Sequence, residues 1–64
     1  MKITINGTPH DLSATTVADA LAEAGFSGKL ATALNGIFVP VGMRPATPLT
    51  EGAALEVLAP MQGG

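Results

Sequence analysis

A strand followed by a hairpin is predicted at the start of the chain. Over residues 2–6 polar side chains alternate with two isoleucines, which predicts a half-buried strand with the isoleucines facing inward. Asn6-Gly7 follows at once, and this dipeptide is typical of a two-residue hairpin turn. Residues 8–12 should return as a second strand. Pro9 has no N–H to donate, so this strand should be short or lie at an edge of the sheet.

Residues 13–25 have the periodicity of a helix. Starting at Val17, apolar side chains recur at i, i+3, i+4 and i+7 and define one apolar face. Thr16 is the expected N-cap, and Asp19 lies three residues later, where the helix dipole favours a negative charge. Gly25 suits the position just after the helix, where a positive φ is needed.

Two shorter strands are predicted after the helix. Residues 30–35 form the first, and Asn35-Gly36 makes a second tight turn into residues 37–39. Segment 40–48 contains three prolines and one glycine, so we expect an irregular crossing loop there.

The last predicted strand covers residues 54–59, with Leu55 and Val57 on one face and Glu56 and Leu58 on the other. The whole order predicts an α+β fold, in which a mixed sheet of four to five strands packs on one main helix. The expected division is a folded domain over residues 1–59 and a flexible C-terminal Gly-Gly tail over the remaining residues.

Composition limits what such a domain can do. Sixty-four residues make one domain, and of the 47% that are hydrophobic many are alanine. That core suffices for one sheet on one helix, but it leaves no room for a pocket with several converging groups. An independent catalyst is therefore not expected.

Charge and cysteine content narrow the classes further. The absence of cysteine removes a cysteine nucleophile from consideration, and the net charge of −2 with three scattered basic residues argues against binding nucleic acid. No apolar run is long enough to span a membrane, and no signal peptide is recognised after Met1. We therefore expect a cytoplasmic protein with no membrane association.

Few side chains before the C-terminus are candidates for chemistry. His10 is the sole histidine, and an exposed edge residue is expected there rather than a general base. The five acidic residues are spread over different predicted elements, so solvated surface charge is expected and no metal site. Leu58 points away from the inner face and should lie near Ala33 of a neighbouring strand. The two would form either a small exposed patch for a partner or an area that a loop covers.

The strongest candidate is the C-terminal pair Gly63-Gly64. Glycine has no Cβ and accepts nearly any φ and ψ, so such an end can enter a narrow channel in another protein. Residues 60–64 would reach at most about 17 Å when extended. Gln62 would then provide access, and Met61 would contact a partner. The alternative is a frayed end without a role.

Several short segments, in this order and spacing, together resemble one family over the whole chain. It is the ThiS/MoaD family of sulfur carriers, and within it most closely the ThiS carriers of thiamine biosynthesis. The matching segments are Met1-Lys2-Ile3 leading to Asn6-Gly7, Thr16-Val17 with Leu21, Ala33-Leu34-Asn35-Gly36, Val39-Pro40, Leu49-x-Glu51-Gly52 and Gln62-Gly63-Gly64. The chain departs from the family pattern at Ala53, where an acidic residue is frequent. It departs again at Val41, where many members have a basic residue and this chain has Arg44 three positions later.

The resemblance implies a ubiquitin-like β-grasp fold, with the first and last strands parallel and adjacent at the centre of the sheet. It implies that an E1-like, ThiF-like enzyme uses ATP and magnesium to adenylate the Gly64 carboxylate, which then becomes a thiocarboxylate. The sulfur donor would be, for example, a cysteine desulfurase, and a ThiG-like thiazole synthase would be the acceptor. The chain would be a protein co-substrate with no bound cofactor. Two alternatives stay open: a MoaD-like subunit of molybdopterin synthase, and a non-carrier β-grasp module that binds proteins.

Overall fold

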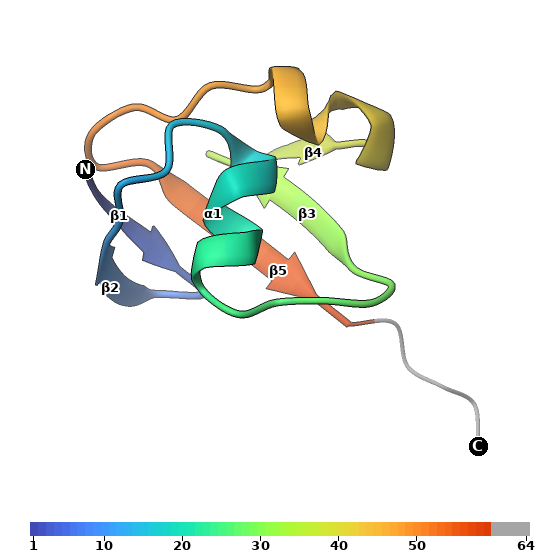
Figure 1. Cartoon of the computed structure of the whole chain (residues 1–64), viewed down its shortest axis with the longest axis horizontal. Helices are drawn as coiled ribbons and strands as arrows, with labels where there is room; N and C mark the ends of the chain where they lie inside the picture. The colour runs from blue at the N-terminus through green and yellow to red at the C-terminus, as the bar shows by residue number, and fades with distance from the viewer. Residues whose placement is uncertain (60–64) are drawn as a thin grey trace.

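A five-stranded mixed sheet carries the single α-helix across one face, in the order β2-β1-β5-β3-β4 (Figure 1). The computed structural model describes residues 1–59. Its elements are β1 (Lys2–Ile5), β2 (Thr8–Asp11), α1 (Val17–Glu23), β3 (Ala31–Leu34), β4 (Ile37–Val39), the 3-10 helix η1 (Val41–Ala46) and β5 (Ala54–Leu58). The predicted α+β architecture is confirmed, and the predicted strands agree with the observed ones to within one residue at each end.

The first and last strands lie side by side at the centre of the sheet. β1 and β5 are parallel, with Thr4 opposite Ala54 and Ile5 opposite Leu55, whereas the pairs β1–β2, β3–β4 and β3–β5 are antiparallel. This arrangement was expected only from the family resemblance, and it is confirmed. It places β5 between β1 and β3, with neighbours on both sides.

The core lies between the sheet and α1. Ile3, Ile5 and Leu55 are at most 2% exposed, and Val17 of the helix is completely buried among them. Burying an aliphatic side chain of this size stabilises the fold by about 1.5–3 kcal/mol. Phe26 packs against the same cluster from the end of the helix. The inner faces predicted by alternation and by helical periodicity are therefore confirmed.

Both predicted Asn-Gly turns are present. Asn6 and Asn35 each have a φ of 51°, and the glycines that follow have φ values of 82° and 83°. Two successive positive φ angles are the hallmark of the hairpin turn whose twist matches the flanking strands, and asparagine and glycine tolerate them best.

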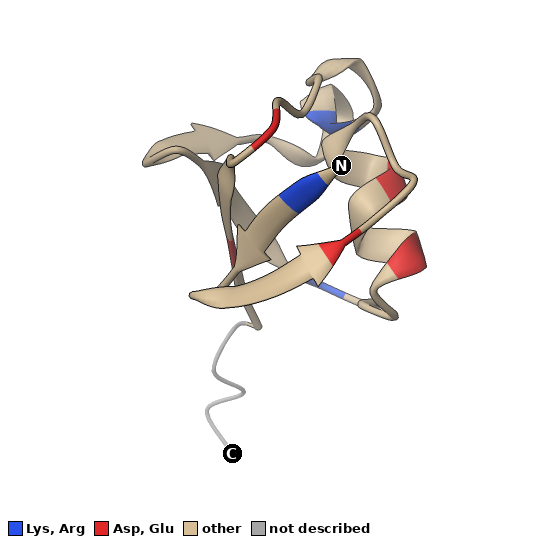
Figure 2. Ribbon diagram, turned by 90° about the vertical axis from the view of Figure 1, so that its left-hand side faces the viewer, with Lys and Arg blue, Asp and Glu red and all other residues tan. Residues whose placement is uncertain are grey.

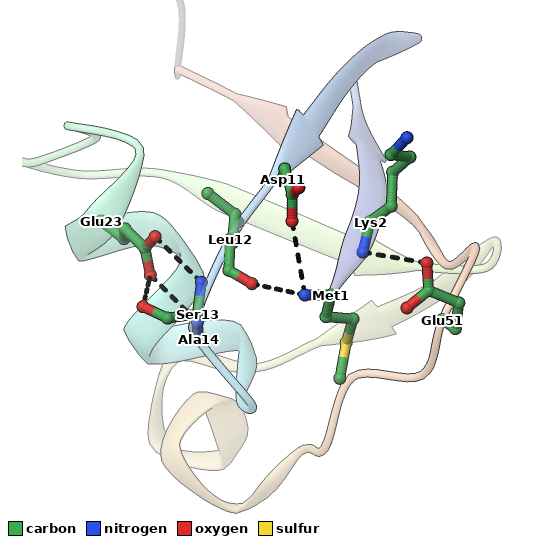
Figure 3. A network of polar contacts seen from close by, with 8 residues as sticks. All are labelled: Met1, Lys2, Asp11, Leu12, Ser13, Ala14, Glu23 and Glu51. Atoms are coloured by element: carbon green, nitrogen blue, oxygen red, sulfur yellow. Dashed lines mark hydrogen bonds and ion pairs between the residues drawn. The ribbon is translucent and has the colours of Figure 1, made fainter.

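The helix begins at Val17, so the prediction that it starts at residue 13 is wrong by one turn. The Ser13 and Ala14 N–H groups donate to the Glu23 carboxylate at 3.0 Å, as does the Ser13 hydroxyl (Figure 3). These bonds attach the segment before the helix to the C-terminal end of α1. The predicted cap is confirmed, because the Thr16 hydroxyl accepts from the Asp19 N–H.

Segment 40–48 was expected to be irregular, but residues Val41–Ala46 form the 3-10 helix η1. Arg44 fixes it to β3: its Nε donates to the Thr32 hydroxyl at 3.1 Å, and its terminal nitrogen donates to the Leu30 carbonyl. The Thr32 hydroxyl in turn donates to the Val39 carbonyl at 2.9 Å. Prolines obscured this helix in the sequence, although proline is well suited to starting one.

Further hydrogen bonds hold the beginning of the central strands β1 and β5 together. Gly52 N–H donates to the Lys2 carbonyl at 2.7 Å, and the Glu51 carboxylate accepts from the Lys2 N–H at 3.1 Å (Figure 3). The N-terminal amine of Met1 donates to the Leu12 carbonyl at 2.7 Å nearby. The Glu51-Gly52 motif thus attaches the turn before β5 to the first strand.

Candidate functional site

The end of β5 is the part of the candidate site that the structure describes. Ala59 is the last described residue, and β5 ends one position earlier at Leu58. The predicted site residues Gly64, Gly63, Gln62 and Met61, together with the rest of the predicted tail, lie outside the described residues. The features that can present this tail are therefore the strand end and the surface around it.

Two different neighbours hold the end of β5. On one side Leu58 pairs with Ala31 of the antiparallel strand β3. On the other side β1 has already turned away, and the Asn6 side chain takes its place. Its Oδ1 accepts from the Val57 N–H at 2.8 Å, and its Nδ2 donates to the Val57 carbonyl at 3.0 Å.

An apolar surface lies on the face of the sheet opposite α1, beside the strand end. We call it the open-face patch and define it as Ala31, Ala33, Phe38 and Leu58. Phe38 and Leu58 are each 66% exposed. The alternative that a loop covers Leu58 is therefore wrong. Ala33 pairs with Phe38 on one side and with Glu56 on the other, so it lies diagonally from Leu58 within the same shallow hollow.

Phe38 was missed by the sequence analysis. In β4 it alternates with the buried Val39, which points toward the core, and this alternation already assigns it to the opposite face. Only the pairing of β4 with β3 brings it next to Ala33, and only the pairing of β3 with β5 brings that strand beside Leu58. The signal in three residues was too short to rank Phe38 above other exposed side chains.

Two hollows in the described part of the surface are small. The one at the open-face patch has a volume of about 150 Å³, and a second, lined by Leu34, Ile37 and Thr47 among others, has about 220 Å³. Both are below the roughly 300–1,000 Å³ of typical small-molecule sites. Both hollows have a mainly apolar lining.

Charged side chains are dispersed over the described residues. Lys2 lies in β1, Lys29 in the loop before β3 and Arg44 in η1, so positive charge forms no stripe (Figure 2). Within residues 1–59 no group of three or more acidic, histidine or cysteine side chains is placed to hold a metal ion. His10 is half-buried on the edge strand β2.

One carboxyl group has a perturbed acidity. The Ser13 backbone N–H is the largest cause, and with the Ser13 hydroxyl and the Ala14 N–H it holds the pKa of Glu23 below its ordinary value of 4.5. These donors stabilise the ionised form. Glu23 lies at the end of α1 and ties it to the segment before the helix, so the shift belongs to the scaffold and not to chemistry at β5.

Comparison with known proteins gives one consistent result. A sequence model of the ThiS family matches residues 3–64. A crystal structure of the thiamine biosynthesis protein ThiS from Geobacter metallireducens is 28% identical, with a TM-score of 0.84 and 100% of both chains covered. An NMR structure of a thiamine biosynthesis protein from the same organism is also 28% identical, with a TM-score of 0.78, covering 100% of this chain and 88% of that one. No curated protein matches the chain.

In residues 1–59 no helix has the length and apolar character required to cross a bilayer.

Proposed function

Because this chain belongs to the ThiS family, we propose that it carries sulfur as a thiocarboxylate on Gly64 for the formation of a thiazole in thiamine biosynthesis. The observation that carries the proposal is the family match, which spans nearly the whole chain and extends through Gly63-Gly64. Two features of the described domain agree with a carrier role. The two hollows described above are small and apolar, and within residues 1–59 no acidic, histidine or cysteine cluster is placed to hold a metal. Partner enzymes would therefore supply the chemistry, and this chain would be their protein co-substrate.

The chemistry begins from a carboxylate, which is a poor acyl donor because its oxygen is a poor leaving group. In the proposed reaction a Gly64 oxygen attacks the α-phosphorus of ATP in an E1-like, ThiF-like enzyme, and pyrophosphate leaves. A sulfur nucleophile, such as the persulfide of a cysteine desulfurase, then attacks the carbonyl carbon and displaces AMP. The acyl disulfide formed from a persulfide is cleaved by a thiol reductant, which is oxidised to a disulfide and leaves the thiocarboxylate on Gly64. ATP and magnesium belong to the activating enzyme, and a ThiG-like thiazole synthase receives the sulfur. Glycine at both last positions leaves the narrow entry to such a site unobstructed.

The folded part of the chain would present this end to each partner in turn. β5 runs through the centre of the sheet and is anchored by Leu55 and Val57, which are 1% and 5% exposed. The open-face patch lies immediately beside the end of the strand. We propose that partner enzymes dock on Leu58, Ala33 and their neighbours in the patch while the tail enters the active site. Apolar surface of this kind, gathered in one place, is typical of interaction sites.

Intact mass spectrometry tests the proposal directly. The full chain is incubated with ATP, magnesium, a ThiF-like enzyme, a sulfur donor and a thiol reductant, and the expected product has one oxygen replaced by one sulfur. A chain that lacks Gly64 and a chain extended by one residue are the matched controls; both should fold and neither should gain sulfur. If the mass of the full chain stays constant with an enzyme that is active on another carrier, the proposal is wrong.

A second arm separates the pathways. The thiocarboxylate form is offered to a thiazole synthase and, in parallel, to the large subunit of molybdopterin synthase. Sulfur transfer to the thiazole synthase alone is expected. Transfer to the molybdopterin enzyme alone would identify a MoaD-like carrier instead. If neither accepts sulfur and the tail can be deleted without loss of partner binding, the chain is a binding module.

A further inference from the structure

Asn6 makes contacts that its role in the hairpin turn does not require. A type I′ turn needs a residue that tolerates positive φ at this position, and glycine alone would satisfy that need. The Asn6 side chain instead reaches a residue 51 positions later in the chain. It contacts both polar backbone groups of Val57, accepting from its N–H and donating to its carbonyl. The two bonds together imitate a peptide group of an adjacent strand.

The contact between Asn6 and Val57 lies at the point where backbone pairing between β1 and β5 stops. Along the parallel ladder, the Thr4 N–H donates to the Ala53 carbonyl and the Asn6 N–H donates to the Leu55 carbonyl, both at 2.9 Å. The next backbone groups of β5 that face β1 are those of Val57, where β1 has already entered its turn. The Asn6 side chain therefore continues the hydrogen bonding between β1 and β5 by one more residue, at Val57, which is the last buried residue of β5.

The second Asn-Gly turn provides an internal comparison. Asn35 has the same φ as Asn6 and is likewise followed by a glycine with positive φ. Its Oδ1 accepts from the Ala54 N–H at 2.9 Å, and Ala54 is the first residue of β5. The two asparagines thus hold opposite ends of the same strand, and only Asn6 holds the end from which the C-terminal residues leave.

We propose that Asn6 is a positioning residue for the carrier reaction, because its amide fixes the end of β5 and with it the origin of the segment that carries Gly64. This inference rests on the proposed function. When the Asn6 amide is removed, Val57 keeps its neighbours on the β3 side but loses both partners on the β1 side. The strand end then opens more frequently, and fewer docked molecules hold the terminal carboxylate in line with the α-phosphorus of ATP.

The effect should appear in turnover and not in docking. The open-face patch belongs to strands β3, β4 and β5 and is not built from Asn6. Binding of the activating enzyme should therefore be retained, while the step that needs an aligned carboxylate slows. Such a change lowers kcat with KM unchanged, whereas a loss of docking surface raises KM.

Four variants test this proposal as two matched pairs. Asn6→Gly and Asn35→Gly keep the turn and remove one side chain each. Asn6→Asp and Asn35→Asp are nearly isosteric and tolerate the left-handed conformation. The aspartate at position 6 loses the donor to the Val57 carbonyl, whereas the aspartate at position 35 keeps the acceptor that Ala54 uses.

Two measurements are made at a temperature where circular dichroism shows each variant folded. Amide hydrogen exchange of Val57, followed by NMR, should be faster by about tenfold in Asn6→Gly, as expected for two lost hydrogen bonds of ordinary strength. The increase should be smaller in Asn6→Asp, which loses the donor to the Val57 carbonyl but keeps the acceptor for the Val57 N–H. Steady-state kinetics of ATP-dependent activation should show a kcat lower by about fivefold for the Asn6 variants, with KM within about twofold of the wild type. Both Asn35 variants should match the wild type in kcat.

Every other outcome contradicts either the proposed function or the proposed role of Asn6. If the wild type is never activated, the proposed function fails and this inference fails with it. If the wild type is activated and the Asn6 variants match it, or if the Asn6 and Asn35 variants slow equally, Asn6 is a structural residue only. A rise in KM alone would assign Asn6 to docking, and unchanged exchange at Val57 would show that its amide does not hold the strand end. Should Asn6→Gly not fold, Asn6→Asp decides the result.

Discussion

Replacing Thr32 by valine tests the buried polar contact that holds η1 against the sheet. Thr32 is 2% exposed, and its hydroxyl donates to the Val39 carbonyl and accepts from Arg44 Nε. Valine has nearly the same shape but can do neither. The variant therefore removes two hydrogen bonds without opening a cavity.

The magnitude follows from the two bonds. A buried neutral hydrogen bond contributes about 1 kcal/mol, and one to a charged group about 1.5–3 kcal/mol. Arg44 is only half-buried, so water can replace part of its lost contact. The expected loss is about 2 kcal/mol, a large share of the roughly 3–10 kcal/mol that a domain of this size has in total.

Urea unfolding followed by circular dichroism measures this loss. With an m-value of about 1–2 kcal/mol/M for so small a domain, the midpoint should fall by about 1–2 M at constant m. Thr50→Val is the matched control, because Thr50 is exposed and its replacement should stay within about 0.5 kcal/mol. Combining Thr32→Val with Arg44→Met should give less than the sum of the two losses, by about 1 kcal/mol.

A loss below about 0.5 kcal/mol for Thr32→Val, or full additivity with Arg44→Met, would refute this account of the segment. Agreement would assign the positive charge of Arg44 to the scaffold.

Three further substitutions probe the core, the patch and the segment before the helix. Leu55→Ala should destabilise the fold by about 2–5 kcal/mol in urea unfolding, because Leu55 is 1% exposed. Leu58→Ala, on the other face of β5, should change the free energy of unfolding by less than about 0.5 kcal/mol. Equal losses would contradict the assignment of these residues to opposite faces. Phe38→Ser should raise the KM of the activating enzyme for this chain by about tenfold, whereas Ile37→Ser, on the opposite face of β4, should leave that KM unchanged. The reverse result would assign docking to the other face of β4. Glu23→Gln should lower the urea midpoint more at pH 7 than at pH 3, with Glu56→Gln, a second exposed carboxylate, as the control. The Glu23 pKa is lowered in the folded state, so its contribution is complete above the ordinary value of 4.5 and is lost as pH falls through the folded value. A difference between wild type and Glu23→Gln that is the same at both pH values would show that the charge is not involved.

Local patterns were sufficient for most of the fold. Alternation identified the inner faces of β1 and β5, and the Thr16 cap and Gly25 marked a helix whose end was predicted correctly. The start of the helix was wrong because Thr16 caps it, and the Ser13 and Ala14 N–H groups ahead of this cap donate to Glu23, ten and nine residues further along the chain. Propensity within a window does not include such a contact.

The candidate site was likewise only partly predictable from local patterns. Alternation placed Leu58 on the outer face of its strand, and its exposure is confirmed. Phe38 joins it only through two successive strand pairings, which no short window of sequence contains. Asn6 was recognised as a turn residue, and its contact with Val57 joins positions 51 residues apart.

The sequence by itself determined the strands, the capped helix, their inner faces, the two hairpin turns and the resemblance that points to Gly63-Gly64. All of these depend on residues that are close along the chain or on side-chain types at fixed spacing. The tertiary structure decided which strands are neighbours, and therefore that an apolar patch lies beside the end of β5 and that Asn6 holds this end. Strand pairing brings distant residues within hydrogen-bonding distance, and such contacts have no local signature in the sequence.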